Sequence, residues 1–236
     1  MHSLFCVWFE MSVNPSINGA GLTKRIFPLL WVVLLGVVLG VGTAWWAIRN
    51  GGAAQSLVKV GPWETSLLAG SPNADSYTRA RVAVVGLLAL GRDETIYYVA
   101  RTDSTGQALR SQCQYRIDGL APPARWWSLT AYADDHFLFE APQDRFSLNG
   151  ATAQLDQRGE FHLLTGPTKP AGGDSSPTDQ VIPSASAQPS HAALAWLPTP
   201  GDRGLELTLR LYHPLPALQQ DPRGLIAPTI KQVGSC

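Results

Sequence analysis

The 236-residue chain carries 18 basic residues (Lys and Arg) and 18 acidic ones, so its formal net charge is zero. A neutral chain offers no basic face to a nucleic-acid backbone, and we expect no nucleic-acid partner. Its 8 tryptophans and 18 prolines stand beside only 15% charged residues. This composition excludes a disordered chain and favours a β-rich domain joined to a membrane element.

The first predicted element is residues 26–48, IFPLLWVVLLGVVLGVGTAWWAI, which contain no charged side chain. A helix of this length would span roughly 34 Å, more than the ~30 Å of the hydrocarbon core of a bilayer. Lys24 and Arg25 precede the run and Arg49 follows it, and by the positive-inside rule this favours a cytoplasmic N-terminus. We therefore predict a cytoplasmic tail, residues 1–25, a single-pass anchor in the bacterial inner membrane, and a periplasmic C-terminal domain.

The N-terminal segment leaves two alternatives open. Translation could start at Met11 instead of Met1. Gly42–Ala44 supplies small residues that a signal peptidase accepts, but the apolar run exceeds the about 7–15 residues of a signal peptide. We favour an uncleaved anchor, and both alternatives export the remainder of the chain.

Export also bears on the three cysteines. Cys6 would stay in the reducing cytoplasm, whereas Cys113 and Cys236 would reach an oxidising compartment that permits a disulfide bond between them. Because the sequence gives no geometry, this bond is left open.

An exported domain, residues 57–236, would follow a short flexible stalk, residues 49–56. The domain opens with a broken amphipathic segment, LVKVGPWETSLLAG. Residues 76–91 then predict a helix that Asp75 or Ser76 can cap. The almost continuous apolar run within it, VAVVGLLAL, suggests that this helix is buried on most sides.

From Tyr97 onward the hydrophobic pattern has a period of two. In CQYRID, residues 113–118, and in LTLRLY, residues 207–212, apolar and polar side chains alternate, as they do in half-buried strands. The turn sequences DSTG, DQRG and PGDRG separate such strands. We therefore predict a mainly β domain, an antiparallel β-sandwich of jelly-roll type with N-terminal helices.

Residues 167–190 interrupt this pattern, because half of the positions are Pro, Gly or Ser. We expect a long flexible loop between two strands. A tolerated surface insertion is favoured over a functional lid, since long loops cost little free energy to close.

The stretch RWWSLTAYADDHFLF, residues 125–139, gives the first candidate site. On a strand, Trp127 would lie on one face and Trp126 and Tyr132 on the other. One face fills the core, and the alternation alone does not say which. The remaining face is either exposed to solvent or lines a groove whose aromatic rings hold a sugar ring or an acyl chain.

Asp134, Asp135 and His136 end the same stretch and are the catalytic candidates, as an acid–base pair with a neighbouring histidine. Adjacent residues of a strand point to opposite faces, however, and aspartate favours turns. We therefore favour a turn over a catalytic site here.

Arg125 and Arg145 each begin an aromatic or apolar strand, so each is a candidate for holding a carboxylate or phosphate at the rim of a sheet. A solvated arginine at a strand end is the simpler alternative.

The sequence nominates no metal and no cofactor. His136, His162 and His213 lie in different segments without metal-motif spacing, although histidines can converge on a jelly roll. The sequence contains no phosphate loop, dinucleotide fingerprint or nucleophile elbow.

Several blocks resemble, in order, a bacterial family known as domain of unknown function 1214 (DUF1214). They are GPWETSLLAGSPNADSYTRARVAVVGLLALGRDETIYYVARTD, ARWWSLTAYADDHFLF, RFSLNG, AWLPTPGDRGLELTLRLYHP and the closing GSC. The resemblance covers residues 57–236 apart from the loop 167–190. It implies an antiparallel β-sandwich of jelly-roll type with helices on the N-terminal side, and it carries over no catalytic residues.

Many members of this family carry a second domain, domain of unknown function 1254, in the same chain. Here a membrane anchor stands in its place, so the resemblance implies a separate membrane protein with the 1254 domain as partner. Our leading hypothesis is a membrane-anchored periplasmic binding or assembly module. The alternatives are a hydrolase-like envelope enzyme acting on a carbohydrate or lipid, and a structural domain that binds a lipid or sugar.

Overall fold

The computed structural model describes residues 19–50, 57–84, 90–141, 145–169, 195–234 and 236. The chain divides into two compact units, Met1–Arg49 and Asn50–Cys236. The alternative start at Met11, most of the expected stalk and most of the expected 167–190 loop lie outside the described residues.

The first unit is built around one helix, α1 (Gly19–Asn50), which extends the predicted 26–48 helix at both ends. Within the described residues, Phe27–Ile48 is the one helical segment long and apolar enough to cross a membrane, with a mean hydropathy of 2.2. The Thr43 hydroxyl donates to the Leu39 carbonyl at 2.7 Å, so this polar group is satisfied inside the helix. Because a signal sequence has the same properties, α1 is a candidate for either an anchor or a signal sequence.

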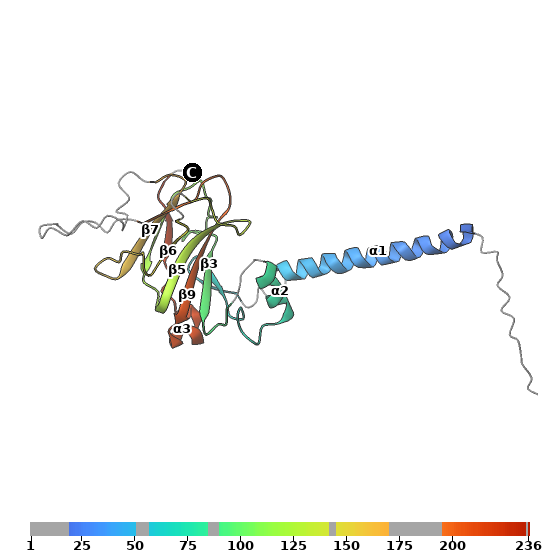
Figure 1. Cartoon of the computed structure of the whole chain (residues 1–236), viewed down its shortest axis with the longest axis horizontal. Coiled ribbons are helices and arrows are strands. Elements are labelled where there is room, and N and C mark those ends of the chain that lie inside the picture. Colours follow the sequence, from blue (N-terminus) through green and yellow to red (C-terminus); the bar gives the residue numbers. More distant parts are fainter. Residues whose placement is uncertain (1–18, 51–56, 85–89, 142–144, 170–194, 235) are drawn as a thin grey trace, which may run out of the picture. The chain divides into compact units, whose positions relative to one another are not determined.

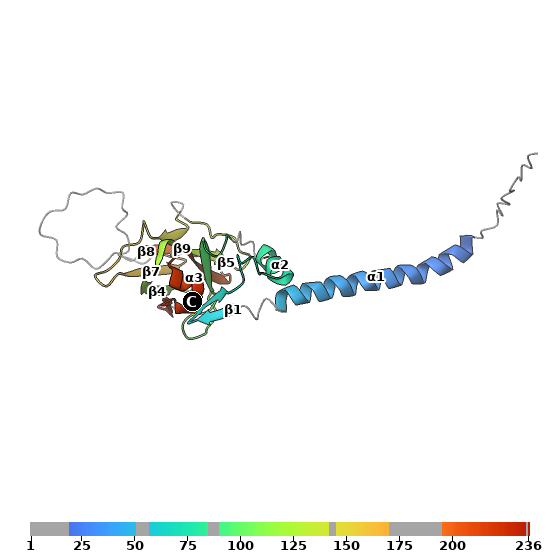
Figure 2. The ribbon, with the colours of Figure 1, turned by 90° about the horizontal axis from the view of Figure 1, so that it is seen from below.

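The second unit contains two β-sheets (Figures 1 and 2). The larger sheet has six strands in the spatial order β1 (Leu57–Val60), β2 (Trp63–Ser66), β3 (Thr95–Ala100), β9 (Leu205–Pro214), β5 (Ala124–Ala133) and β6 (Ser147–Asn149). The smaller sheet has four, in the order β10 (Thr229–Gln232), β4 (Tyr115–Leu120), β7 (Glu160–Gly166) and β8 (Ala195–Pro198). The short helices are α2 (Ser76–Val84), α3 (Pro216–Gln220) and the 3-10 turn η3 (Pro222–Gly224).

The core lies between the two sheets. On β9, Leu207, Leu209 and Leu211 are fully buried, as the period-two pattern predicts. The ring of Trp127 on β5 packs against that of Phe161 on β7, with 4.9 Å between the centroids, so side chains of both sheets meet in one core. The prediction of a mainly β domain is confirmed.

The pairing of the strands differs in detail from the expected antiparallel jelly roll. The larger sheet is antiparallel throughout, but β7 and β8 pair in parallel, with Leu163 opposite Ala195 and Gly166 opposite Pro198. A jelly roll has about eight strands in two Greek keys, whereas the described strands divide into six and four.

The opening amphipathic segment of the domain is a β-hairpin, β1–β2, turning at Gly61, whose φ is 60°. This backbone conformation suits glycine, which has no Cβ to clash. Trp63 is fully buried and its indole nitrogen donates to the carbonyl of Pro228 at 2.7 Å. The buried indole ring of Trp63 therefore fixes the hairpin to the C-terminal segment around Pro228.

The start of the predicted helix 76–91 is correct, and its described residues are mostly not buried as expected, while residues 85–89 of its apolar run lie outside the described residues. The Asp75 carboxylate accepts from the Thr78 backbone nitrogen at 2.7 Å, so Asp75 is the predicted cap. The described helix α2 ends at Val84, which is 48% exposed, and Leu90 is 38% exposed. Side chains of the two sheets fill the core themselves, and among the described residues of α2 only Thr78 is buried.

Cys113 and Cys236, the pair left open by the sequence, are joined by a disulfide bond. Cys113 lies just before β4 and Cys236 just after β10, and these two strands pair antiparallel with Tyr115 opposite Gln232. The bond therefore closes the end of this strand pair across a sequence separation of 123 residues.

We predict that Cys236→Ser lowers the free energy of unfolding by about 2–4 kcal/mol, because the unfolded chain loses a long covalent loop. Urea denaturation of the full-length protein in detergent, with and without reductant, would measure this. Cys6→Ser is the matched control and should leave the midpoint unchanged. A wild-type midpoint that does not move on reduction would contradict the prediction.

Candidate functional site

The outer face of the larger sheet carries a group of aromatic side chains around one arginine. We call it the aromatic–arginine face. The register of the three central strands sets Tyr97 of β3 opposite Arg210 of β9, and Trp126 of β5 opposite Tyr212. These positions alternate with the buried leucines of β9, so they lie on the side of the sheet away from the core. The face consists of Tyr97, Trp126, Tyr132, Arg210 and Tyr212.

Arg210 is the centre of this face. Its guanidinium carbon lies 5.9 Å from the centroid of the Tyr97 ring and 5.3 Å from that of Tyr132, which are cation–π distances. Nη2 donates to the Tyr132 hydroxyl at 2.9 Å. Within the part of the chain that the structure describes, no carboxylate forms an ion pair with Arg210, so its positive charge is oriented by aromatic groups but not neutralised.

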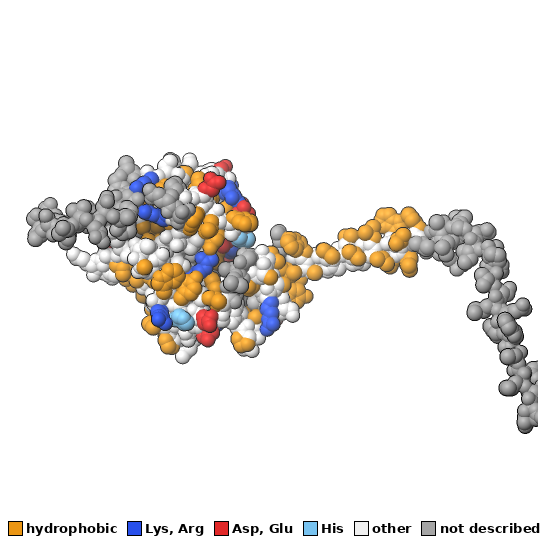
Figure 3. Space-filling view, in the orientation of Figure 1, with side chains coloured by type: hydrophobic (Ala, Val, Ile, Leu, Met, Phe, Trp, Pro, Cys, Tyr) orange, Lys and Arg blue, Asp and Glu red, His pale blue; other side chains and the backbone are white. Residues whose placement is uncertain are grey.

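Trp126 forms the exposed part of the same face. Its ring packs against Tyr212 with 5.0 Å between the centroids and remains 40% exposed. Figure 3 shows hydrophobic side chains gathered with basic ones on the side of the domain where β5 and β9 lie. The face can therefore offer stacking surface and a positive charge to the same ligand.

The predicted ligand residues are only partly brought together. Trp126 and Tyr132 share this face, as the alternation predicts. Arg125 is exposed next to Trp126, and Arg145 lies before β6. The hydrogen bonds described for Arg210 involve neither of these arginines. Prediction from the sequence missed Tyr97, Arg210 and Tyr212. Their only signal was the polar phase of the alternating β3 and β9 sequences, TIYYVA and LTLRLY.

Asp134, Asp135 and His136 form the turn that follows β5. The His136 backbone nitrogen donates to the Ala133 carbonyl at 2.9 Å, and the Asp135 carboxylate accepts from the Phe137 nitrogen at 3.1 Å. His136 has a φ of 67°, in the left-handed region. The backbone at these three residues is thus that of a tight turn.

The side chains of this turn have structural partners. Arg203 forms ion pairs with both Asp134 and Asp135, and its hydrogen bond holds the pKa of the Asp135 carboxyl below its usual value. A lowered pKa opposes a role as general acid near neutral pH. The imidazole Nδ1 of His136 lies 3.9 Å from Glu206, which is paired at 2.6 Å with Arg101. These contacts are those of a stabilised turn.

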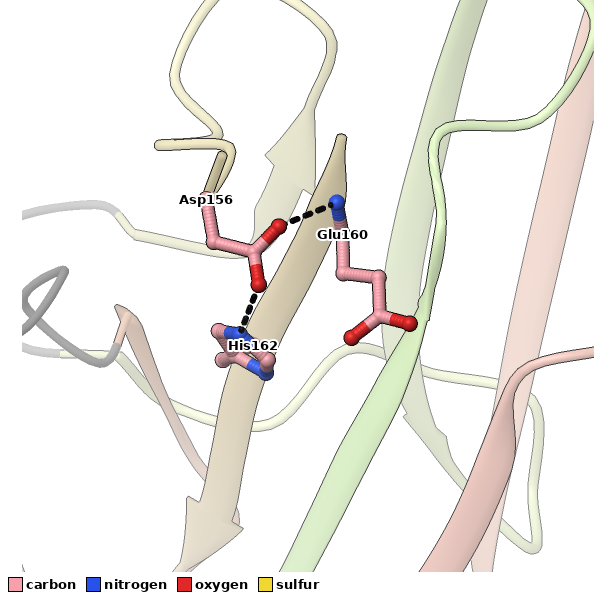
Figure 4. A group of neighbouring side chains, drawn as sticks. All are labelled: Asp156, Glu160 and His162. Atoms are coloured by element: carbon pink, nitrogen blue, oxygen red, sulfur yellow. Dashed lines mark hydrogen bonds and ion pairs between the residues drawn. The ribbon is translucent and has the colours of Figure 1, made fainter. Parts of the chain in front are cut away.

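A second polar group lies on the outer face of the smaller sheet (Figure 4). Asp156 begins the DQRG turn, Glu160 follows the turn as the first residue of β7, and His162 lies on the same strand. One ligand atom from each lies within 4.8 Å of the others, and such a group could hold a metal ion. From the sequence, His162 was considered only with His136 and His213, whereas the hairpin brings two carboxylates to it.

A cavity of about 400 Å³ lies elsewhere on the domain. Its walls are the side chains of Glu140, Ala141, Pro167, Trp196, Pro198 and Pro200. The indole nitrogen of Trp196 is buried without a hydrogen-bond partner. None of the predicted site residues lines this cavity.

Fold and site together define a class: a two-sheet β domain with an aromatic–arginine face, preceded by a helix apolar enough to span a membrane. A family model described as "Protein of unknown function (DUF1214)" matches residues 94–180 and 178–216. This is more than half of the chain, and the protein belongs to the DUF1214 family.

Two solved structures resemble the chain. The crystal structure of the VPA0106 protein from Vibrio parahaemolyticus has 19% sequence identity and a TM-score of 0.52, over 86% of this chain and 45% of that one. At this identity the likeness shows the fold alone, and the chain spans less than half of the Vibrio protein's length. The crystal structure of an uncharacterized protein from Burkholderia cenocepacia has 15% identity and a TM-score of 0.34, over 59% of this chain and 29% of that one. No curated protein matches the sequence.

We predict that His136→Val lowers the free energy of unfolding by about 1–2 kcal/mol relative to His136→Asn, because a β-branched residue tolerates the left-handed region poorly and asparagine tolerates it well. Both variants remove the imidazole, so their difference in urea denaturation isolates the backbone effect. Equal losses in the two variants would instead assign the role of His136 to its contact with Glu206.

Proposed function

We propose that the protein is a membrane-anchored module of the bacterial envelope that binds a second envelope protein through the aromatic–arginine face. In this proposal α1 is the uncleaved inner-membrane anchor, the N-terminus is cytoplasmic and the β domain is periplasmic. The observation that carries the proposal is Arg210, a cation oriented by Tyr97 and Tyr132 without a carboxylate partner among the described residues.

The composition of the face supports a protein partner. Tryptophan, tyrosine and arginine are the residues that most often dominate the binding energy of protein–protein interfaces. Trp126 and Arg210 lie on neighbouring strands, and the Tyr212 ring next to Trp126 and the Tyr132 hydroxyl at Arg210 restrict their conformations before binding. Such pre-ordering reduces the entropy lost on association.

The positive charge of Arg210 indicates which side chain the partner should place against it. Covering Arg210 without neutralising it would cost the desolvation of a cation. The partner should therefore place an aspartate or glutamate on the guanidinium and an apolar side chain against Trp126.

Two observations support a proposal for the origin of the partner. The matching region of the Vibrio protein is less than half of a longer chain, so there this fold is continuous with further protein. The apolar helix α1 would hold the present domain at the membrane surface, where a second membrane protein has a high effective concentration. We propose that a separate membrane protein with the 1254 domain supplies the partner.

The alternative of a hydrolase-like enzyme built on Asp134, Asp135 and His136 gains no support. Both carboxylates are paired with Arg203, and His136 is held in the turn. A sugar or lipid ligand would use the same aromatic rings, and the experiment below separates it from a protein.

The proposal is tested by placing a photo-crosslinking amino acid at position 126 of the full-length protein in native membranes. Position 77 is the matched control, because Tyr77 is also an exposed aromatic residue, at 50%, but lies on α2. We expect one protein to be crosslinked at position 126 and none at position 77.

Arg210→Gln supplies the specificity control, because it removes the charge while keeping a polar side chain. We expect it to reduce the yield of the crosslinked protein at position 126 at least tenfold. An undiminished yield, or a crosslink to lipid or glycan alone, would contradict a protein partner that pairs with Arg210.

A further inference from the structure

The hairpin that leads into β7 presents three metal-ligand side chains on the outer face of the smaller sheet. The turn Asp156–Gly159 is closed by a hydrogen bond from the Gly159 nitrogen to the Asp156 carbonyl at 3.0 Å. Gly159 has a φ of 77°, as expected for the left-handed position of this turn. The tight turn returns the chain so that Glu160 and His162 come back beside Asp156 (Figure 4).

The two carboxylate oxygens of Asp156 have different roles. Oδ1 accepts from the backbone nitrogens of Arg158 at 2.8 Å and Glu160 at 2.9 Å, which fixes the side chain in one orientation. Oδ2 is thereby directed at Nε2 of His162, 3.6 Å away. The two hydrogen bonds to Oδ1 therefore also fix the position of Oδ2.

His162 is oriented from its other side. Its Nδ1 lies 2.7 Å from Oδ1 of Asp118, which faces it across the β4–β7 pairing, and Arg116 holds the same oxygen at 2.8 Å. Burial opposes ionisation of Asp118, but the hydrogen bonds from Arg116 and His162 lower the pKa of its carboxyl. An imidazole whose Nδ1 donates to a carboxylate presents Nε2 as a lone-pair donor, the arrangement that supports histidine ligands in metal sites.

The separation between Nε2 of His162 and Oδ2 of Asp156 fits two ligands of one ion. At 3.6 Å it is too long for a hydrogen bond. Two ligands at ~2.1 Å from a tetrahedral zinc ion are roughly 3.4 Å apart. The Glu160 carboxylate completes the group within 4.8 Å.

A cation already occupies the place between the two carboxylates. The Arg158 guanidinium contacts Oδ2 of Asp156 at 3.4 Å and Oε2 of Glu160 at 3.1 Å. Its side chain is 75% exposed, so it can leave at small cost. The carboxylates thus attract positive charge at a position that a competing ion could take.

We propose that Asp156, Glu160 and His162 bind a divalent transition-metal ion of the zinc class, with Asp118 as the residue that positions His162. The mixed imidazole and carboxylate ligands suit zinc better than calcium or magnesium, which prefer oxygen alone. Three protein ligands leave a position on a tetrahedral ion for water. This site lies on a different sheet from the aromatic–arginine face, so the inference does not depend on the proposed partner.

The test is zinc titration of the full-length protein in detergent by calorimetry, after removal of any affinity tag and treatment with chelator. We expect one zinc ion per chain at this site. Asp156→Asn keeps the acceptor of the turn but removes the anionic ligand, and His162→Ala removes the imidazole. Each should weaken binding about 100-fold or more, and Asp118→Asn about 10–100-fold, because the positioning hydrogen bond is lost or reversed.

Two further variants make the result specific. His213→Asn removes an exposed histidine of β9, a strand of the other sheet. Asparagine accepts the left-handed φ of 46° at this position, so zinc affinity should stay unchanged. Arg158→Ala removes the competing cation and should tighten zinc binding several-fold, an effect that loss of folding could not produce. Failure of the wild type to bind zinc, or equal affinity in wild type and His162→Ala, would overturn the proposal.

Discussion

The pairing of β5 with β9 at the centre of the larger sheet is the constraint on which the other features depend. Its register sets Leu129 opposite Leu209 and Trp126 opposite Tyr212. Because side chains alternate between the faces of a strand, the register that buries the leucines of β9 also places Arg210 beside the aromatic rings on the other side. A slip of one residue would put Arg210 in the core. One pairing therefore determines both the packing of the domain and its candidate binding face.

Features with a local cause could be predicted from the sequence, and those that need partners from distant segments could not. The alternation in LTLRLY, the cap at Asp75 and the turn at Asp134–His136 each depend on neighbouring residues, and the structure contains all three. The environment of Arg210 depends on β3 and β5 lying on either side of β9, which no local pattern encodes. Likewise, Asp118 and His162 are 44 residues apart in the chain and meet only through the register of β4 and β7.

The two candidate sites occupy the outer faces of different sheets, and the common core separates them. On the larger sheet, the candidate site is an arginine surrounded by aromatic rings, which suits contact with a large ligand surface that excludes water. On the smaller sheet it consists of carboxylates and an imidazole fixed by hydrogen bonds, suited to a small cation. Because the core side chains of Trp127 and Phe161 lie between the sheets, a substitution on one outer face need not disturb the other.

The buried indole of Trp63, bonded to the carbonyl of Pro228 across 165 residues of chain, has a consequence for the order of folding. The Tyr98 hydroxyl makes a similar buried bond to Pro222, 124 residues away. Contacts of such high sequence separation require large chain loops to close before they stabilise anything, which slows folding. Trp63 of the first hairpin therefore lacks its buried hydrogen-bond partner until residues near Pro228 have been synthesised. The packing of this domain should therefore be completed late, after residues near Pro228 have joined the core.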